Sequence, residues 1–209
     1  MGKVSVDISM SLDGFSAGPD DGFGQGLGVG GERLHSWLFG GDWSYGDEAG
    51  SAAGVDREVL DEIFTASGAH IVGRRMFDVV EGWGYQNPFQ APCFVLTHRV
   101  DDELRALAPT FTFVTDGIES ALRQARAVAG DKDVSIGGGA NVAQQFLRAG
   151  LVEELNLHLA PVFLGTGKRL FENLTSAPFT LKQDRVLVSP LATHLRYVVT
   201  PQAQSRQTS

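Results

Sequence analysis

Hydrophobic and polar positions along the chain predict a series of strands. Residues 4–9 alternate between apolar and polar, the period-two pattern of a strand with one buried face and one more polar face. Three later runs, 69–72, 93–96 and 134–136, are more continuously apolar, as is typical of interior strands covered on both sides. A shorter run at 111–114 is similar.

Segments with apolar residues at helical spacing separate these strands. They lie at 56–67, 118–129 and 142–149. Strands that alternate with helices form βαβ units, so we expect an α/β fold with a mostly parallel sheet.

The pattern changes near the carboxyl end. Leu155, Leu157 and Leu159 alternate with other residues, and 194–199 reads as a further strand with no long helix before it. This favours an antiparallel pair that closes one side of a mixed sheet. We expect one domain over 1–200 and a disordered tail over 201–209, because the tail is polar and aperiodic.

A glycine-rich stretch, 16–54, has no strong periodicity apart from a short helix expected at 32–39. A loop of this length in a compact domain is usually functional or disordered. It contains Trp37, Phe39 and Trp43, which indicates packing against something. A surface flap and a lid that lines a substrate pocket both fit this pattern.

Composition narrows the function classes. A chain of 209 residues with 43% hydrophobic content suits a compact globular domain. A net charge of −8 argues against nonspecific binding to nucleic acid or to anionic membranes. The single cysteine, Cys93, lies in an apolar run without Cys/His metal spacing, so we expect neither an internal disulfide nor a metal site. No segment resembles a secretory signal or a spanning helix, and a cytoplasmic protein is expected.

Three predicted strands end in residues suited to a phosphorylated ligand. These residues are Gly73, Arg74, Arg75 and Met76 after the first, Thr97, His98 and Arg99 after the second, and Gly137, Gly138 and Gly139 after the third. In an open α/β sheet the ligand crevice lies outside the carboxyl ends of the strands. Guanidinium groups suit phosphate because their planar fork donates paired hydrogen bonds. Solvated arginines at strand ends are the alternative for each segment taken alone.

The triple glycine favours a phosphate cradle. Without Cβ atoms, a ligand can approach the backbone closely. The helix expected after it, from Ala140, Asn141 and Val142 onward, would present unpaired NH groups. A tight strand-to-helix connection is an equal alternative. The segment is not a GxGxxG fingerprint, because Val142 stands where the last glycine would be, and it lacks the lysine of a P-loop.

Together these motifs resemble the dihydrofolate reductase superfamily. The quoted segments are Ser11 to Gly14, Gly73 to Arg75, Thr97 to Arg99, the triple glycine, Gly150 to Leu155 and Leu159 to Phe171. The closer resemblance is to the reductase domain of bifunctional riboflavin biosynthesis deaminase-reductases, and it covers nearly the whole chain. It implies a mixed sheet of eight or nine strands, helices on both faces and NADPH across the strand ends.

The resemblance also implies roles for individual residues. Arg74 and Arg75, with Thr97, His98 and Arg99, would hold the adenosine 2′-phosphate and the adenine side. Residues 138–142 would hold the pyrophosphate, where the superfamily often has a cis Gly-Gly bond. Asp13 and the 11–18 loop would border the nicotinamide.

The substrate is less constrained. Glu32, His35 and Trp37 do not align with the acidic residue that pairs with the pterin in folate reductases, and the zinc deaminase segments are absent. The 16–54 loop replaces the family's substrate-binding segment. Trp37, Trp83 and Lys168 are candidate substrate contacts, with core packing or a solvated loop as the alternatives.

Two further residues have competing interpretations. Asp13 is the candidate catalytic residue, because a carboxyl near the nicotinamide could relay a proton. Its alternative is a structural Asp-Gly turn. His158, between leucines, is expected to be a satisfied sheet or interface histidine rather than a catalyst.

The expected activity is hydride transfer from NADPH to a small heterocyclic, pterin- or pyrimidine-like, or carbonyl substrate. The resemblance relates it to 5-amino-6-(5-phosphoribosylamino)uracil reductases. The alternative is a non-catalytic NADP(H)-binding or structural oligomeric protein that retains the fold. Alternating strands near the carboxyl end make a homodimer plausible.

Overall fold

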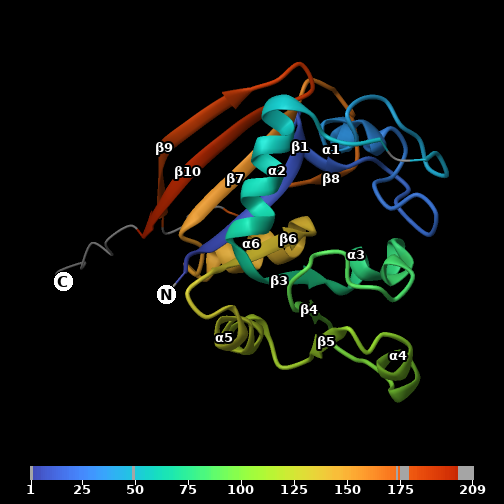
Figure 1. The fold of residues 1–209 in the computed structure, drawn as a ribbon, viewed down its shortest axis with the longest axis vertical. Helices are drawn as coiled ribbons and strands as arrows, with labels where there is room; N and C mark the ends of the chain where they lie inside the picture. Colours follow the sequence, from blue (N-terminus) through green and yellow to red (C-terminus); the bar gives the residue numbers. More distant parts are fainter. Residues whose placement is uncertain (1, 49, 173, 175–178, 202–209) are drawn as a thin grey trace, which may run out of the picture.

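The fold is a mixed sheet with helices on both faces (Figure 1). A computed structural model describes residues 2–48, 50–172, 174 and 179–201. Its main sheet has eight strands in the order β5-β4-β3-β6-β1-β7-β10-β9. They are β1 (Val4–Ser11), β3 (Ser67–Gly73), β4 (Cys93–Leu96), β5 (Phe111–Val114), β6 (Asp133–Gly138), β7 (Glu154–Ala160), β9 (Phe179–Val188) and β10 (Thr193–Pro201). A small second sheet pairs β2 (Phe15–Ala17) with β8 (Lys168–Arg169).

Strands β5, β4, β3, β6, β1 and β7 run parallel, and β10 is antiparallel to both of its neighbours. This confirms the predicted parallel core and the antiparallel closing strands. The three longer helices are α2 (Gly54–Ala66), α5 (Ile118–Ala129) and α6 (Ala140–Arg148), close to the predicted bounds. The shorter ones are η1 (Gly31–His35), α1 (Ser36–Phe39), α3 (Arg74–Val79), η2 (Glu81–Trp83) and α4 (Asp102–Leu107).

One face of the sheet is apolar. Val6 of β1, Ile136 of β6 and Leu155 of β7 are each at most 1% exposed, and they share a core cluster with residues of α5 and α6. Phe146 of α6 is also fully buried in this cluster. This face therefore supplies the main hydrophobic core.

The opposite face of the sheet is polar and buried. Ser9 of β1, Ser135 of β6 and His158 of β7 lie there and are less than 7% exposed. In Figure 1, α2 crosses over the sheet in front of β1 and β7. The more polar side of β1 is therefore covered by protein.

Three features of the fold differ from the sequence expectations. Strand β9 was not predicted, because it lies at the sheet edge and is exposed along most of its length, which removes the apolar alternation. Pro201 was assigned to the tail but ends β10, where it pairs with Phe179 of that unpredicted strand. Residues 202–209 of the expected tail lie outside the described residues. The short helices α3 and α4 were not predicted either.

Candidate functional site

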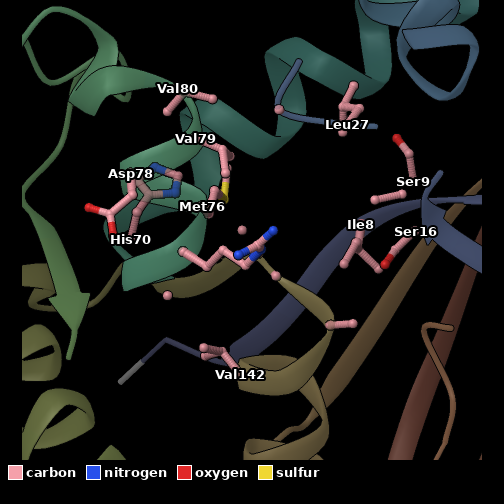
Figure 2. A pocket seen from close by; sticks show the side chains of 18 of the residues that line it. Ile8, Ser9, Ser16, Leu27, His70, Met76, Asp78, Val79, Val80 and Val142 are labelled. Atoms are coloured by element: carbon pink, nitrogen blue, oxygen red, sulfur yellow. The ribbon is translucent and has the colours of Figure 1, made fainter. Parts of the chain in front are cut away.

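A cavity of about 1510 Å³ opens at the carboxyl ends of β3, β4 and β6. Pockets for a single small ligand are roughly 300–1,000 Å³, so this one has room for two ligands side by side. Figure 2 shows Ile8, Ser9 and Ser16 on one side of it, and Met76 and Val79 on the other. All the residues predicted to bind the cofactor line it, and so do Trp37, Trp83 and Lys168.

The triple glycine forms an open cradle at the end of β6. A Cβ added at Gly137 or Gly139 would meet no atom within 4 Å, whereas one at Gly138 would lie 2.6 Å from Met76 Sδ. Protein packing therefore explains the absence of a side chain only at Gly138, whose φ is also +146°. The peptide bond between Gly138 and Gly139 is cis.

Helix α6 begins directly after this cradle. Its N-cap is Gly139, and no side chain caps its first turn. An uncapped helix N-terminus at a cavity offers NH groups and a partial positive charge to an anion. The geometry of this end of the cavity thus suits a pyrophosphate.

The two consecutive arginines have different partners. Arg74 donates from Nη1 to the carbonyl oxygen of Arg99 over 3.1 Å and forms an ion pair of 2.6 Å with Asp78. The hydroxyl of Thr97 donates to that same carbonyl oxygen over 2.7 Å. Arg74 and the 97–99 segment therefore form one basic corner at the ends of β3 and β4.

Arg75 points instead to the loop before α1. It donates from Nη2 to Asp21 Oδ1 over 2.8 Å, and the ammonium group of Lys168 also contacts this carboxylate. The hydrogen bond from Arg75, and then that from Lys168, lowers the pKa of Asp21 to about 2. Asp21 thus joins the 16–54 loop to α3 and β8 along the cavity wall.

The 16–54 loop contributes an aromatic wall. Trp37, Phe39, Trp43 and Tyr45 all line the cavity. The hydroxyl of Tyr45 accepts a 2.7 Å hydrogen bond from the backbone NH of Leu27, which ties the two halves of the loop together. These contacts favour the substrate-lining interpretation of the loop over a simple flap.

Trp83 has both of the roles that the sequence allowed. It lines the cavity, and its ring stacks on Phe111 with the planes 15° apart and the centroids 6.0 Å apart. It therefore packs against the apolar cluster of β4 and β5 while it forms part of the cavity wall.

Asp7 lies at the floor of the cavity and was not among the candidate residues. Its carboxyl accepts hydrogen bonds from Ser5 Oγ at 2.6 Å, Ser135 Oγ at 3.0 Å and Asn156 Nδ2 at 2.8 Å. Burial raises the pKa of Asp7 from its usual value and outweighs these hydrogen bonds. The only sequence signal was its place among the polar positions of the first strand.

His158 also reaches the cavity, from β7. Its Nδ1 lies 2.9 Å from Nδ1 of His194, and Nε2 of His194 lies 2.8 Å from Asp56 Oδ1. Its own Nε2 is buried without a hydrogen-bond partner. The expectation of a satisfied histidine was therefore wrong for one of the two ring nitrogens.

Asp13 is not among the residues that line the cavity. Its carboxylate accepts hydrogen bonds from Ser11 Oγ at 2.6 Å and from the backbone NH groups of Gly165 at 2.7 Å and Leu164 at 3.2 Å. The hydrogen bond from Ser11 is the largest cause of a pKa lowered to about 2. These contacts fasten the turn after β1 to the segment after β7, which favours the structural interpretation of this residue.

The sheet order, the helices on both faces and the cavity at the strand ends define a dihydrofolate reductase-like fold. Dihydrofolate reductase from Enterococcus faecalis, in a complex with NADP(H), is similar with a TM-score of 0.58 and 14% identity, over 95% of this chain and 97% of that one. A candidate riboflavin biosynthesis protein from Shewanella sp. PV-4 gives a TM-score of 0.68 at 20% identity, over 95% and 99% of the two chains. At these identities the likeness establishes the fold.

Within this fold, the chain belongs to the RibD C-terminal domain family, which it matches over residues 2–194. Protein YyaP of Bacillus subtilis (strain 168) is 39% identical over 183 residues, which cover 81% of this chain and 80% of YyaP. The resemblance inferred from the strand-end motifs is confirmed. None of the helices in the described part of the chain is long and apolar enough to cross a membrane.

Proposed function

We propose that this protein is an NADPH-dependent reductase that transfers a hydride to a small heterocyclic or carbonyl substrate. The observation that carries the proposal is the convergence of three strand-end segments on one cavity with room for two ligands. NADPH would supply the hydride, and the chain would supply binding and orientation.

The fit of NADPH rests on the residues at the strand ends. Gly137 and Gly139 leave open space where a side chain would otherwise stand, and the uncapped N-terminus of α6 adjoins them. We assign the pyrophosphate to this cradle. The basic corner of Arg74, His98 and Arg99 is then the site for the adenosine 2′-phosphate, because guanidinium groups bind phosphate through paired hydrogen bonds.

The second ligand would occupy the aromatic end of the cavity. Trp37 and Trp43 suit a planar ring, and Asp7 and His158 offer hydrogen-bonding groups beneath them. This supports a pterin- or pyrimidine-like heterocycle as the substrate class, with a small carbonyl compound as the other possibility. In this proposal Lys168 and Arg75 hold the 16–54 loop through their contacts with Asp21. Asp13 has a structural role.

Turnover separates this proposal from its rival, a non-catalytic NADP(H)-binding or structural protein. The test is oxidation of NADPH, followed by absorbance, with a panel of oxidised pteridines, pyrimidines and small carbonyl compounds. Consumption of NADPH that depends on one panel member supports the reductase. Tight NADPH binding with no consumption on any of them supports the rival.

Replacement of Arg74 by alanine tests the cofactor assignment. A charge-assisted hydrogen bond contributes about 1.5–3 kcal/mol, so we expect Arg74→Ala to weaken NADPH binding roughly 10- to 100-fold. NADH lacks the 2′-phosphate, and its affinity should change little. Fluorescence titration of the bound nicotinamide measures both affinities.

The matched control is Arg105→Ala, an exposed arginine on α4 outside the cavity, which should leave both affinities unchanged. Arg75→Ala should discriminate less between the two cofactors, because Arg75 pairs with Asp21 on the loop side, whereas Arg74 contacts the 97–99 segment. Equal losses of NADPH and NADH in Arg74→Ala would refute the 2′-phosphate assignment. Absence of NADPH binding by the wild type would refute the function itself.

A homodimer and a cytoplasmic location complete the proposal. Strand β9 forms one edge of the sheet and carries exposed apolar residues, among them Val186 and Val188, at 41% and 66% exposure. Exposed apolar residues at a sheet edge suit self-association. Light scattering on the purified protein measures the mass, and a monomer at micromolar concentration would contradict the dimer.

A further inference from the structure

A buried chain of three side chains leads from α2 to the floor of the cavity. Asp56 of α2, His194 of β10 and His158 of β7 are 3%, 5% and 4% exposed. They are joined by contacts of 2.8 Å and 2.9 Å, and the chain ends at the unpartnered Nε2 of His158. None of the strand-end motifs includes these residues.

The two contacts restrict where protons can be. The carboxylate of Asp56 accepts, so Nε2 of His194 carries a proton. Between the two Nδ1 atoms one nitrogen must donate and the other must accept. When the pair is neutral, the single proton of His194 lies on Nε2, so His158 donates from Nδ1 and its own Nε2 carries no proton.

One added proton reverses this arrangement. If His194 carries protons on both nitrogens, its Nδ1 donates to His158. Neutral His158 then carries its proton on Nε2 and can donate it from that atom. The positive charge in that state resides on His194, next to the carboxylate of Asp56.

We propose that His158 exchanges a proton with the substrate in the cavity, and that His194 and Asp56 hold the pair in the protonation states for that exchange. This rests on the proposed reductase function, because addition of a hydride to a C=N or C=O bond requires a proton to complete the reduction. The Nε2–H bond of His158 breaks as the new N–H or O–H bond forms on the substrate. At the same time the shared proton moves from Nδ1 of His194 to Nδ1 of His158, and NADP⁺ is the oxidised product.

The surroundings of His158 favour this division of charge. Burial, followed by the charge of His194, lowers the pKa of His158 itself to about 3, which disfavours a positive charge on that ring. Two other charged or titratable groups act on His158, namely His35 of η1 and Arg196 of β10, and both lower its pKa. Asp56 is the one carboxylate among the described residues that hydrogen-bonds to either ring, so it is the group that stabilises the charged state.

A purely structural role explains the unpartnered nitrogen poorly. A buried polar atom with no hydrogen bond costs about 1–3 kcal/mol, and native proteins rarely retain one without a reason. Ring packing on Trp37, with centroids 4.4 Å apart, would be served by an apolar side chain. His70 provides a contrast, because it also lines the cavity and has an unpartnered Nε2, but its ring stacks on Phe89, and among the described residues it has no hydrogen bond to a carboxylate.

NMR spectra of the histidine nitrogens test the hydrogen-bonded series Asp56–His194–His158 directly, without a substrate. Protein labelled with ¹⁵N-histidine is examined by long-range ¹H–¹⁵N correlation from pH 8 to pH 4. We expect bare Nε2 on His158 and bare Nδ1 on His194 at pH 8, and protons on both of these atoms after one coupled uptake at lower pH. Separate, uncoupled titration of the two rings would overturn the proposal, as would a proton on Nε2 of His158 at pH 8.

The variant for this measurement is Asp56→Asn, and Asp61→Asn is its control. Asp61 lies on the same helix, but it pairs with Arg57 at the exposed surface. Removal of the carboxylate should move the coupled proton uptake to lower pH, because a close negative charge favours the protonated pair. The control should leave it unchanged, and an unchanged value in Asp56→Asn would contradict the proposal. Wild-type spectra decide the question if Asp56→Asn does not fold.

Activity provides the second readout, on the panel member that the wild type reduces. General acid catalysis contributes about 10²- to 10⁴-fold, so His158→Gln should lower kcat at least 10²-fold and remove the fall in kcat toward high pH, where the wild-type pair has lost its added proton. The affinity for NADPH should stay within twofold. A kcat within threefold of wild type overturns the role of His158. NADPH binding tests the proposed function and the spectra test the histidine pair, so each can fail alone.

Discussion

The two faces of the central sheet are buried to a similar extent but differ in chemistry. Leu155 on one face and Ser135 on the other are each 1% exposed. The first packs in an apolar cluster under α5 and α6, whereas the second donates a hydrogen bond to Asp7 at the cavity floor. A fold needs only one apolar face for its core, so the second face is free to carry chemistry that costs stability.

Hydrogen bonds on the polar face connect β1 to the aromatic wall of the cavity and to β7. Ser9 accepts a 3.0 Å hydrogen bond from Nε1 of Trp37, and so connects the sheet to the aromatic wall. Asn156 connects Asp7 to Glu154 on the same face. Hydrogen bonds therefore hold this face together where the other is held by packing, and the predictions below test that difference.

The largest expected effect is a difference between the two faces in how much a substitution lowers the free energy of unfolding. Leu155→Ala should lower the free energy of unfolding by about 2–5 kcal/mol, because it leaves a cavity in the apolar core. Ser135→Ala, at equal burial, should cost only about 1 kcal/mol, the net value of a hydrogen bond. Urea denaturation of both variants measures the difference. Equal losses would mean that the polar face contributes to the core as the apolar face does.

A smaller effect is expected where the sheet meets the proposed cofactor. Gly137→Ala should weaken NADPH binding at least tenfold, about 1.4 kcal/mol, because the new methyl group fills the open cradle. Stability should change by less than about 1 kcal/mol, since no protein atom lies within 4 Å of that position. Gly22→Ala, also in open space but outside the cavity lining, is the control. Unchanged NADPH affinity would place the pyrophosphate elsewhere.

The smallest effect concerns the pH dependence of the polar face. Asp7→Asn removes a carboxyl whose pKa burial raises in the folded state. The wild type therefore loses stability as pH rises from about 4, the value in the unfolded chain, to the raised folded value. The variant should be more stable than the wild type at pH 8, and this advantage should fade toward pH 4. Denaturation at both values measures it, and an advantage that is constant with pH would argue against a raised pKa.

Apolar periodicity was sufficient to predict the parallel core and its three longer helices. It failed at β9, where Lys182, Gln183 and Asp184 interrupt the pattern because both faces of that edge strand are exposed. A strand held mainly by backbone pairing with β10 leaves little trace in the order of its side chains. The same limit explains why Pro201 was assigned to the tail.

The predicted cofactor residues lie together at the cavity because strand-end motifs are local, and parallel strands bring their carboxyl ends to one edge. The floor of the cavity could not be found this way. Alternation in β1 shows that Ser5, Asp7 and Ser9 share a face, but it does not show whether water or another helix covers that face. The partnership of His158 with His194 depends on the register of two strands that are far apart in the chain.

The reversed direction of β10 has a consequence for tolerance to sequence change. Because β10 runs antiparallel to β7, His194 near its start lies directly opposite His158 near the end of β7. The pairing register of the two strands, rather than the path between them, sets the distance between the imidazoles. Insertions or deletions in the connection from β7 to β9 would therefore leave the histidine pair in place, even where they disturb β8 and the contact of Lys168 with Asp21.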